Sequence, residues 1–108
     1  MTEPDRPDGF TWAACLHRPG PAAPESGSIF DAPLFAEHVA WLQRRLAAGE
    51  LVAAGPLGDE EGAGMTILRL TGAGRHADAE ALATIDDRSV AEGLFVVAVR
   101  PWHVLMAG

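Results

Sequence analysis

Apolar stretches alternate along the chain with segments rich in glycine, proline and charged residues. The spacing of the apolar positions predicts strands at residues 10–17, 50–57, 65–71 and 94–106, the last interrupted or bent at Pro101. The same spacing predicts helices at about residues 33–48 and 75–85. The order β-α-β-β-α-β is the ferredoxin-like, split βαβ arrangement. We therefore expect an α+β domain with a four-stranded antiparallel sheet and two helices on one face.

The ends of the first predicted helix carry specific signals. Asp31 is the predicted N-cap, Pro33 stands in the first turn, and Gly49 follows the last helical residue. The proline-rich segment 18–33 before this helix is predicted to be a long loop. Its residues 18–30 are expected to edge a cleft and to be more mobile than the strands. Residues 1–8 are predicted to form a flexible tail, so that a single domain spans 9–108.

The charge of the chain argues against two classes of partner. The 108 residues carry a formal net charge of -7, and all eight basic residues are scattered arginines, so no nucleic-acid partner is expected. No apolar run is long enough to cross a membrane, and no membrane partner is expected. The start of the chain lacks the features of a secretory signal. A single cysteine, Cys15, excludes an internal disulfide, which favours a cytoplasmic location.

The last predicted strand is apolar on both faces. Its residues 94–99 include no charged or polar side chain, and the second strand is uncharged from Leu51 to Ala54. Two helices can cover only one face of the sheet. An apolar face of several hundred Å² is unusual on a monomer. We therefore expect a homodimer in which two sheets pack against each other.

The first predicted helix carries a histidine on its apolar stripe. His38 lies four residues from Leu34 and four from Leu42, so its ring is expected to face inward. One interpretation is a core histidine bonded to a backbone carbonyl. The other is a general acid or base in a cleft, because imidazole titrates near neutral pH. A carboxylate against one ring nitrogen would orient the ring and stabilise its charged form.

Two adjacent acids follow the second predicted helix. Asp86 or Asp87 could cap the short segment "RSVAEG", and the other could point inward. The residues alone leave this assignment open by one position.

The ordered set of short motifs resembles the YCII-related domain family. These motifs are "RPGP", "EHVAWL", "AAGELVAAGPLGD" and "IDDRSVAEGLFVVAVRPW", and they cover the chain from about Phe10 to Trp102. The resemblance implies a dimeric α+β barrel with a His-Asp pair in a cleft, matched here by His38 and Asp87. Arg88 stands where the family pattern has proline. A few family members resemble enzymes that eliminate, isomerise or dehalogenate small cyclic or aromatic molecules.

Four further residues are candidates for substrate binding. Trp12 could wall a pocket for a flat ring, and His17 ends the first strand beside the long loop. Gly55 and Pro56 close the second strand, where they either expose backbone to the cleft or only end the strand. The four histidines show no His-x-x-x-His or similar pair, so neither a metal nor another cofactor is expected.

These observations predict a small-molecule enzyme without a cofactor. His38 would transfer a proton and Asp87 would support it, in an elimination, isomerisation or hydrolysis of a cyclic or aromatic substrate, in secondary metabolism or degradation. The alternative is a non-catalytic dimer that binds a small molecule or serves as an accessory scaffold. A cavity lying far from His38, or filled by bulky side chains, would favour the alternative.

Overall fold

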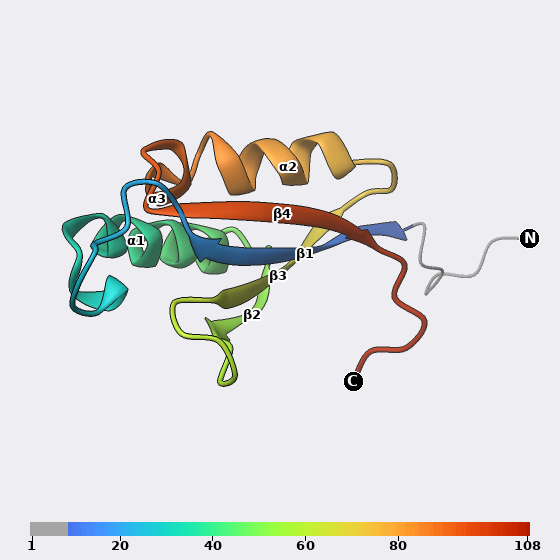
Figure 1. Ribbon diagram of the computed structural model, residues 1–108. Helices are drawn as coiled ribbons and strands as arrows, with labels where there is room; N and C mark the ends of the chain where they lie inside the picture. The colour runs from blue at the N-terminus through green and yellow to red at the C-terminus, as the bar shows by residue number, and fades with distance from the viewer. Residues whose placement is uncertain (1–8) are drawn as a thin grey trace, which may run out of the picture.

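The computed structural model describes residues 9–108 and has the predicted α+β architecture (Figure 1). The tail predicted at residues 1–8 lies outside the described residues. In chain order the elements are β1 (Phe10–Pro19), η2 (Ile29–Asp31), α1 (Pro33–Ala47), β2 (Leu51–Pro56), β3 (Gly64–Thr71), α2 (His76–Thr84), α3 (Arg88–Ala91) and β4 (Phe95–Trp102). The two main helices and all four strands thus lie where the hydrophobic pattern predicts them.

The four strands form one antiparallel sheet in the order β2-β3-β1-β4. The central strand β1 pairs with both β3 and β4, and its residue His17 lies opposite Gly64 and Val97. A bulge between Leu51 and Ala53 interrupts the pairing of β2 with β3. The short β2–β3 connection makes these two strands a hairpin, because sequential antiparallel strands need only a brief turn.

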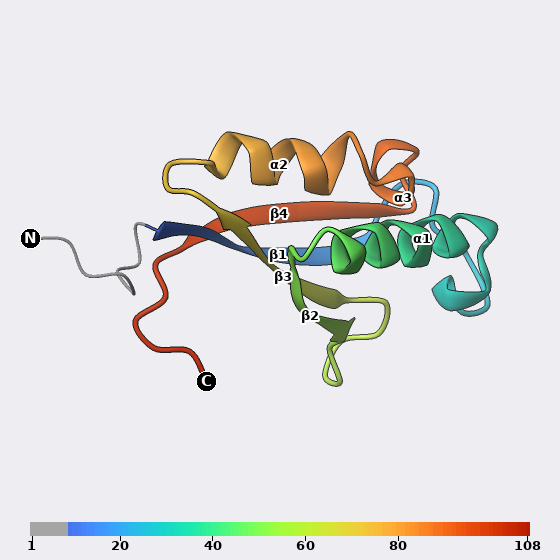
Figure 2. The ribbon, with the colours of Figure 1, turned by 180° about the vertical axis from the view of Figure 1, so that it is seen from behind.

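Both main helices pack on the same face of the sheet. Figure 2 shows α1 in front of β1 and β3, while α2 runs along β4. Between the two helices and the sheet lies a core of fully buried side chains, which comprises Ala13, Cys15, Trp41, Leu68, Leu70, Ala79 and Ala83. The small residues on α2 let this short helix approach the sheet closely, while Trp41 of α1 fills the remaining space.

The two ends of α1 differ in how well the sequence predicted them. Asp31 is not the N-cap, because a turn of 3-10 helix comes first and Ala32 takes that position without a side-chain bond. The prediction at the C-terminal end is confirmed. Gly49 has a φ of 76°, and its N–H and that of Glu50 donate to the carbonyls of Leu46 and Arg45. This Schellman arrangement favours glycine because other residues are strained at positive φ.

The last strand is shorter than predicted, since β4 ends at Trp102 and not at residue 106. It is not broken at Pro101, which pairs with Ala13. Proline is tolerated there because β4 is an edge strand, where a missing N–H need not interrupt the ladder.

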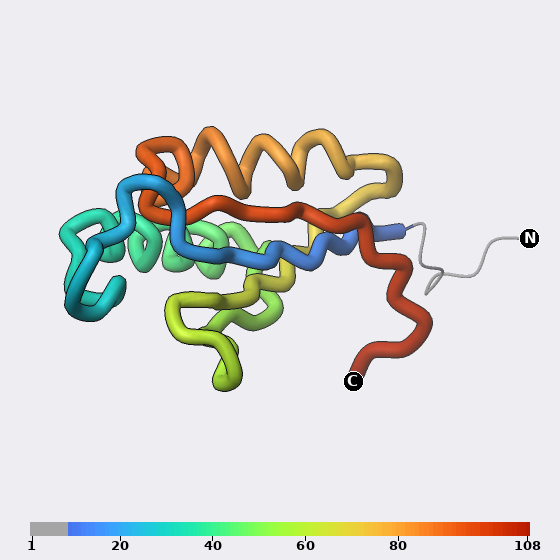
Figure 3. Tube along the Cα trace, in the orientation of Figure 1, coloured from blue at the N-terminus to red at the C-terminus, as the bar shows by residue number. Residues whose placement is uncertain are grey.

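The segment after β1 folds back beside the start of α1 and the end of β1 (Figure 3). The N–H groups of Gly20 and Ala22 donate to the carbonyls of Leu94 and Gly93, each at 2.8 Å. A Cβ at Gly20 would collide with the Gly93 carbonyl, so this close approach requires glycine. The segment is therefore anchored to the chain just before β4, and it positions Phe30 near α1.

The sheet face opposite the helices is apolar and open. Alternate residues of β1, β3 and β4 point to it, including Val96, which is 50% exposed, and Trp102, which is 46% exposed. Val97, in contrast, packs against the core beneath the helices. The arginines 69 and 100 lie among these apolar residues on the open face.

Candidate active site

His38 lies in the N-terminal half of α1 and points toward α3. Its Nδ1 lies 2.8 Å from Oδ2 of Asp87, and the His38 side chain is only 10% exposed. An ionised carboxylate can only accept a hydrogen bond, so Nδ1 of His38 carries the hydrogen and donates it. In a neutral ring Nε2 then carries no hydrogen. The ring stacks on Trp41 at 5.7 Å between centroids and contacts Phe95 at 5.3 Å, which fixes its plane.

Asp87 is fully buried and has two roles at once. Its Oδ1 accepts hydrogen bonds from the N–H of Ser89 at 3.0 Å and the hydroxyl of Ser89 at 2.7 Å, so it caps α3. Its Oδ2 accepts from His38. Three donors converge on one carboxylate, which compensates for removing its charge from water. The cap and the partner of His38 are therefore the same residue.

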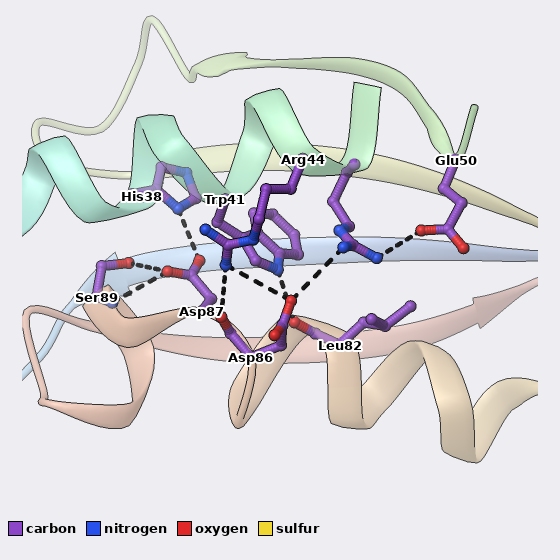
Figure 4. A network of polar contacts seen from close by, with 9 residues as sticks. His38, Trp41, Arg44, Glu50, Leu82, Asp86, Asp87 and Ser89 are labelled. Atoms are coloured by element: carbon purple, nitrogen blue, oxygen red, sulfur yellow. Dashed lines mark hydrogen bonds and ion pairs between the residues drawn. The ribbon is translucent and has the colours of Figure 1, made fainter. Parts of the chain in front are cut away.

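The neighbouring carboxylate has a different environment (Figure 4). The side chain of Asp86 is 45% exposed and lies 3.6 Å from Arg44 and 3.7 Å from Arg45. Arg44 also donates to the backbone carbonyl of Asp86 at 3.0 Å, and Arg45 reaches Glu50 at 2.6 Å. These contacts tie the junction between α2 and α3 to α1. Of the two acids, Asp87 faces His38, and the contacts of Asp86 with α1 help to hold Asp87 in that position.

A cavity of about 120 Å³ opens beside His38. It lies between α1, the ends of β1 and β2, and the starts of β3 and β4. Of the predicted site residues, His17, His38, Gly55 and Pro56 line it. A Cβ built at Gly55 meets no atom within 4 Å, so packing alone does not require glycine there. The remaining walls are mostly apolar and include Phe30, Phe35, Leu42, Met65 and Phe95.

His17 is the second histidine in the cavity. It is 2% exposed, and its ring centroid lies 4.9 Å from that of His38 and 5.6 Å from that of Phe95. Among the described residues, neither of its ring nitrogens has a hydrogen-bond partner. Burial, and then the adjacent His38, lower the pKa of His17 to about 4, although Asp87 and a nearby backbone group of Cys15 oppose the shift. The ring is therefore neutral near pH 7.

Trp12 does not reach this cavity. It forms an edge-to-face pair with Trp102 at 6.0 Å and lines a separate hollow near the N-terminal end of β1. His17 and Trp12 are five residues apart, and an odd separation along a strand places side chains on opposite faces. The structure thus does not bring Trp12 together with the other predicted site residues.

Three side chains could in principle hold a metal ion. One donor atom each from His17, His38 and Asp87 lies within 4.8 Å of the other two, a convergence that spacing along the chain did not predict. Two histidines and a carboxylate form a known ligand set for divalent metals. Both oxygens of Asp87 are already occupied, however, by His38 and Ser89. A metal bound at Nδ1 of His38 would have to break the bond to Asp87, whereas a metal bound at Nε2 would leave that bond intact.

Some residues of the site were not predicted. Ser89 follows Asp87 by two positions, a spacing typical of capping turns, and could have been found from that pattern. The three phenylalanines at 30, 35 and 95 come from η2, α1 and β4, and only the fold brings Phe95 to the other two. Cys15 is fully buried in the core, and burial raises the pKa of its thiol to about 12.

No protein-family model matches the chain, and no curated protein matches it at a significant level. Within residues 9–108, none of the helices combines the length and the apolar character that crossing a bilayer requires.

Proposed function

We propose that this protein is a small-molecule enzyme in which His38 and Asp87 act as a general acid/base pair. The observation that carries the proposal is the 2.8 Å hydrogen bond between His38 Nδ1 and Asp87 Oδ2 at the wall of a cavity. The resemblance of the sequence motifs to the YCII-related family supports the same assignment. A cavity beside His38 also favours catalysis over the accessory-scaffold alternative.

The chemistry follows from the two ring nitrogens. With Nδ1–H bound to Asp87, Nε2 accepts a proton from a bound molecule, and the resulting imidazolium is stabilised by the carboxylate. The same nitrogen then returns the proton to another atom of the molecule or to a leaving group. This sequence describes an isomerisation or an elimination, and it describes hydrolysis when the proton comes from water. The apolar walls suit a cyclic or aromatic substrate.

Deuterium exchange tests the proton-transfer step without knowledge of the natural substrate. Cyclohex-2-enone is a six-membered ring with acidic hydrogens beside its carbonyl, and NMR in D₂O follows their exchange. We expect the wild type to accelerate exchange and His38→Gln to lose about 100-fold of that acceleration. His103→Gln, at an exposed histidine outside the cavity, is the matched control and should behave as the wild type. A wild type that accelerates no exchange with this ring or related ring ketones would favour a non-catalytic binding module.

We also propose that the protein is a cytoplasmic homodimer. The open apolar face of β1, β3 and β4 supports a partner of the same kind, because two copies would cover each other's exposed valines and aromatic rings. The free, buried Cys15 suits a reducing compartment. Sedimentation should give about twice the monomer mass.

A charge introduced on that face by substitution tests the dimer. Val96→Asp should give a folded monomer, because Val96 points away from the helices and is half exposed. Ile85→Asp, at a residue that is 79% exposed after α2, is the control and should leave the mass unchanged. A wild type that sediments as a monomer at micromolar concentration would contradict the dimer.

A further inference from the structure

His17 is a buried polar side chain without a partner. It is 2% exposed on the central strand β1, and neither ring nitrogen is bonded within the described part of the chain. Leaving a buried donor or acceptor unpaired costs about 1–3 kcal/mol, and the great majority of such groups are paired. A group of this kind at the wall of a cavity indicates that its partner is a bound molecule.

The surrounding side chains explain why the protein does not satisfy His17 itself. Its nearest ring neighbours are His38 and Phe95, both in edge-to-face contact. Both oxygens of Asp87 are occupied by other donors. A backbone group of Cys15 lies near the ring but makes no hydrogen bond with either ring nitrogen, and the ring lines the cavity. Because the His17 ring is neutral near pH 7, it offers one donor and one acceptor to a ligand.

The walls of the cavity limit what can bind. Phenylalanine rings from η2, α1 and β4 surround it, and no lysine or arginine lines it. A carboxylate or phosphate would therefore have no fixed positive charge to meet. The volume of about 120 Å³ is comparable with that of a cavity of about 150 Å³ that holds one benzene molecule.

We propose that this cavity binds an uncharged, ring-shaped molecule with a hydroxyl or carbonyl oxygen, and that His17 holds that oxygen by a hydrogen bond. The proposal rests on the proposed function, since it names the substrate class of the same site. His17 is then the binding residue and His38 the proton carrier. One nitrogen of His17 lies within 4.8 Å of a donor atom of His38, so a single small ring can contact both.

Binding of three probes tests the proposal: phenol, toluene and benzoate. Dissociation constants are measured by NMR titration of the wild type and of His17→Leu, which replaces an unpaired polar group by an apolar one and should fold well. The preference for phenol over toluene should be about threefold to tenfold larger in the wild type, which is the net value of one hydrogen bond. Benzoate should bind more weakly than phenol. His17→Gln should restore part of the preference, and His103→Leu, the matched control, should keep all of it.

Three outcomes would overturn the proposal. The first is a preference for phenol that is the same in the wild type and in His17→Leu. The second is a wild type that binds benzoate most tightly. The third is Zn²⁺ binding to the wild type that displaces phenol and is lost in His17→Leu, because His17 would then be a metal ligand.

The test is independent of the exchange assay. If deuterium exchange requires His38 but the phenol preference is unchanged in His17→Leu, only the proposed substrate class is wrong. If the phenol preference is lost in His17→Leu but deuterium exchange is unchanged in His38→Gln, the proposed function is wrong and the proposed binding site still stands.

Discussion

Two regions lie between α1 and the sheet, and they treat polar groups in opposite ways. Beside the C-terminal half of the helix, Trp41 is fully buried and its Nε1–H donates to the Leu82 carbonyl at 2.8 Å (Figure 4). Beside the N-terminal half, His17 is equally buried, and its nitrogens have no partner among residues 9–108. The first region is organised for stability, whereas the second leaves a buried group available to a ligand.

The two regions are joined through consecutive residues. Asp86 holds the α2–α3 junction to arginines of α1, and Asp87 turns inward to His38. The packed region therefore supplies a frame that holds His38 and Asp87 at the wall of the cavity. The proposed acid/base pair would need such support to keep its geometry.

Removing the tryptophan should have the largest effect on stability. Trp41→Ala should lower the free energy of unfolding by about 3–5 kcal/mol, because it leaves a large cavity and an unpaired Leu82 carbonyl. Urea denaturation at fixed protein concentration measures this change. Leu46→Ala on the same helix is the control, since Leu46 is 64% exposed and should cost less than about 0.5 kcal/mol. Equal losses from the two variants would show that Trp41 is not a packing anchor.

Replacing each of the adjacent acids by alanine should distinguish the buried partner of His38 from the acid that binds the arginines of α1. Asp87→Ala should cost about 3 kcal/mol, because it removes the cap of α3 and leaves His38 without its partner. Asp86→Ala should cost less than about 1 kcal/mol, because its side chain is 45% exposed and lies 3.6 and 3.7 Å from its two arginine partners. The same urea assay applies to both. If Asp86→Ala proved the more damaging variant, the assignment of the buried partner would be wrong.

The unpaired histidine should make stability depend on pH. The pKa of His17 is about 4 in the folded chain and near 6.5 in the unfolded one, so the unfolded state takes up the proton first. Stability should therefore fall as the pH drops from about 6.5 to 4, by at most about 3 kcal/mol from this group. His38 and Asp87 lie beside it in both proteins. As the pH falls over that range, the free energy of unfolding should drop more in the wild type than in His17→Leu. Parallel pH curves of the two proteins would contradict the assignment.

The sequence predicted the fold better than it predicted the site. Apolar spacing located the helices and strands, because each buries one face. It could not choose between Asp86 and Asp87, since adjacent acids are equally able to cap a turn and only the three-dimensional contacts separate them. Nor could it place His17 against His38, which are 21 positions apart and meet because β1 passes beneath α1. The separation of Trp12 from His17 was predictable from strand parity alone.

The central claim is that His38 and Asp87 work as one unit, and a double-mutant cycle on the exchange of cyclohex-2-enone tests it most directly. His38→Gln, Asp87→Asn and the double variant are compared with the wild type, and the asparagine keeps an oxygen that can cap α3. We expect His38→Gln to lose more activity than Asp87→Asn, because it removes the proton carrier itself. The double variant should be no slower than His38→Gln alone, because the carboxylate acts only through the ring. Losses that multiply in the double variant, or full exchange activity in His38→Gln, would contradict the account.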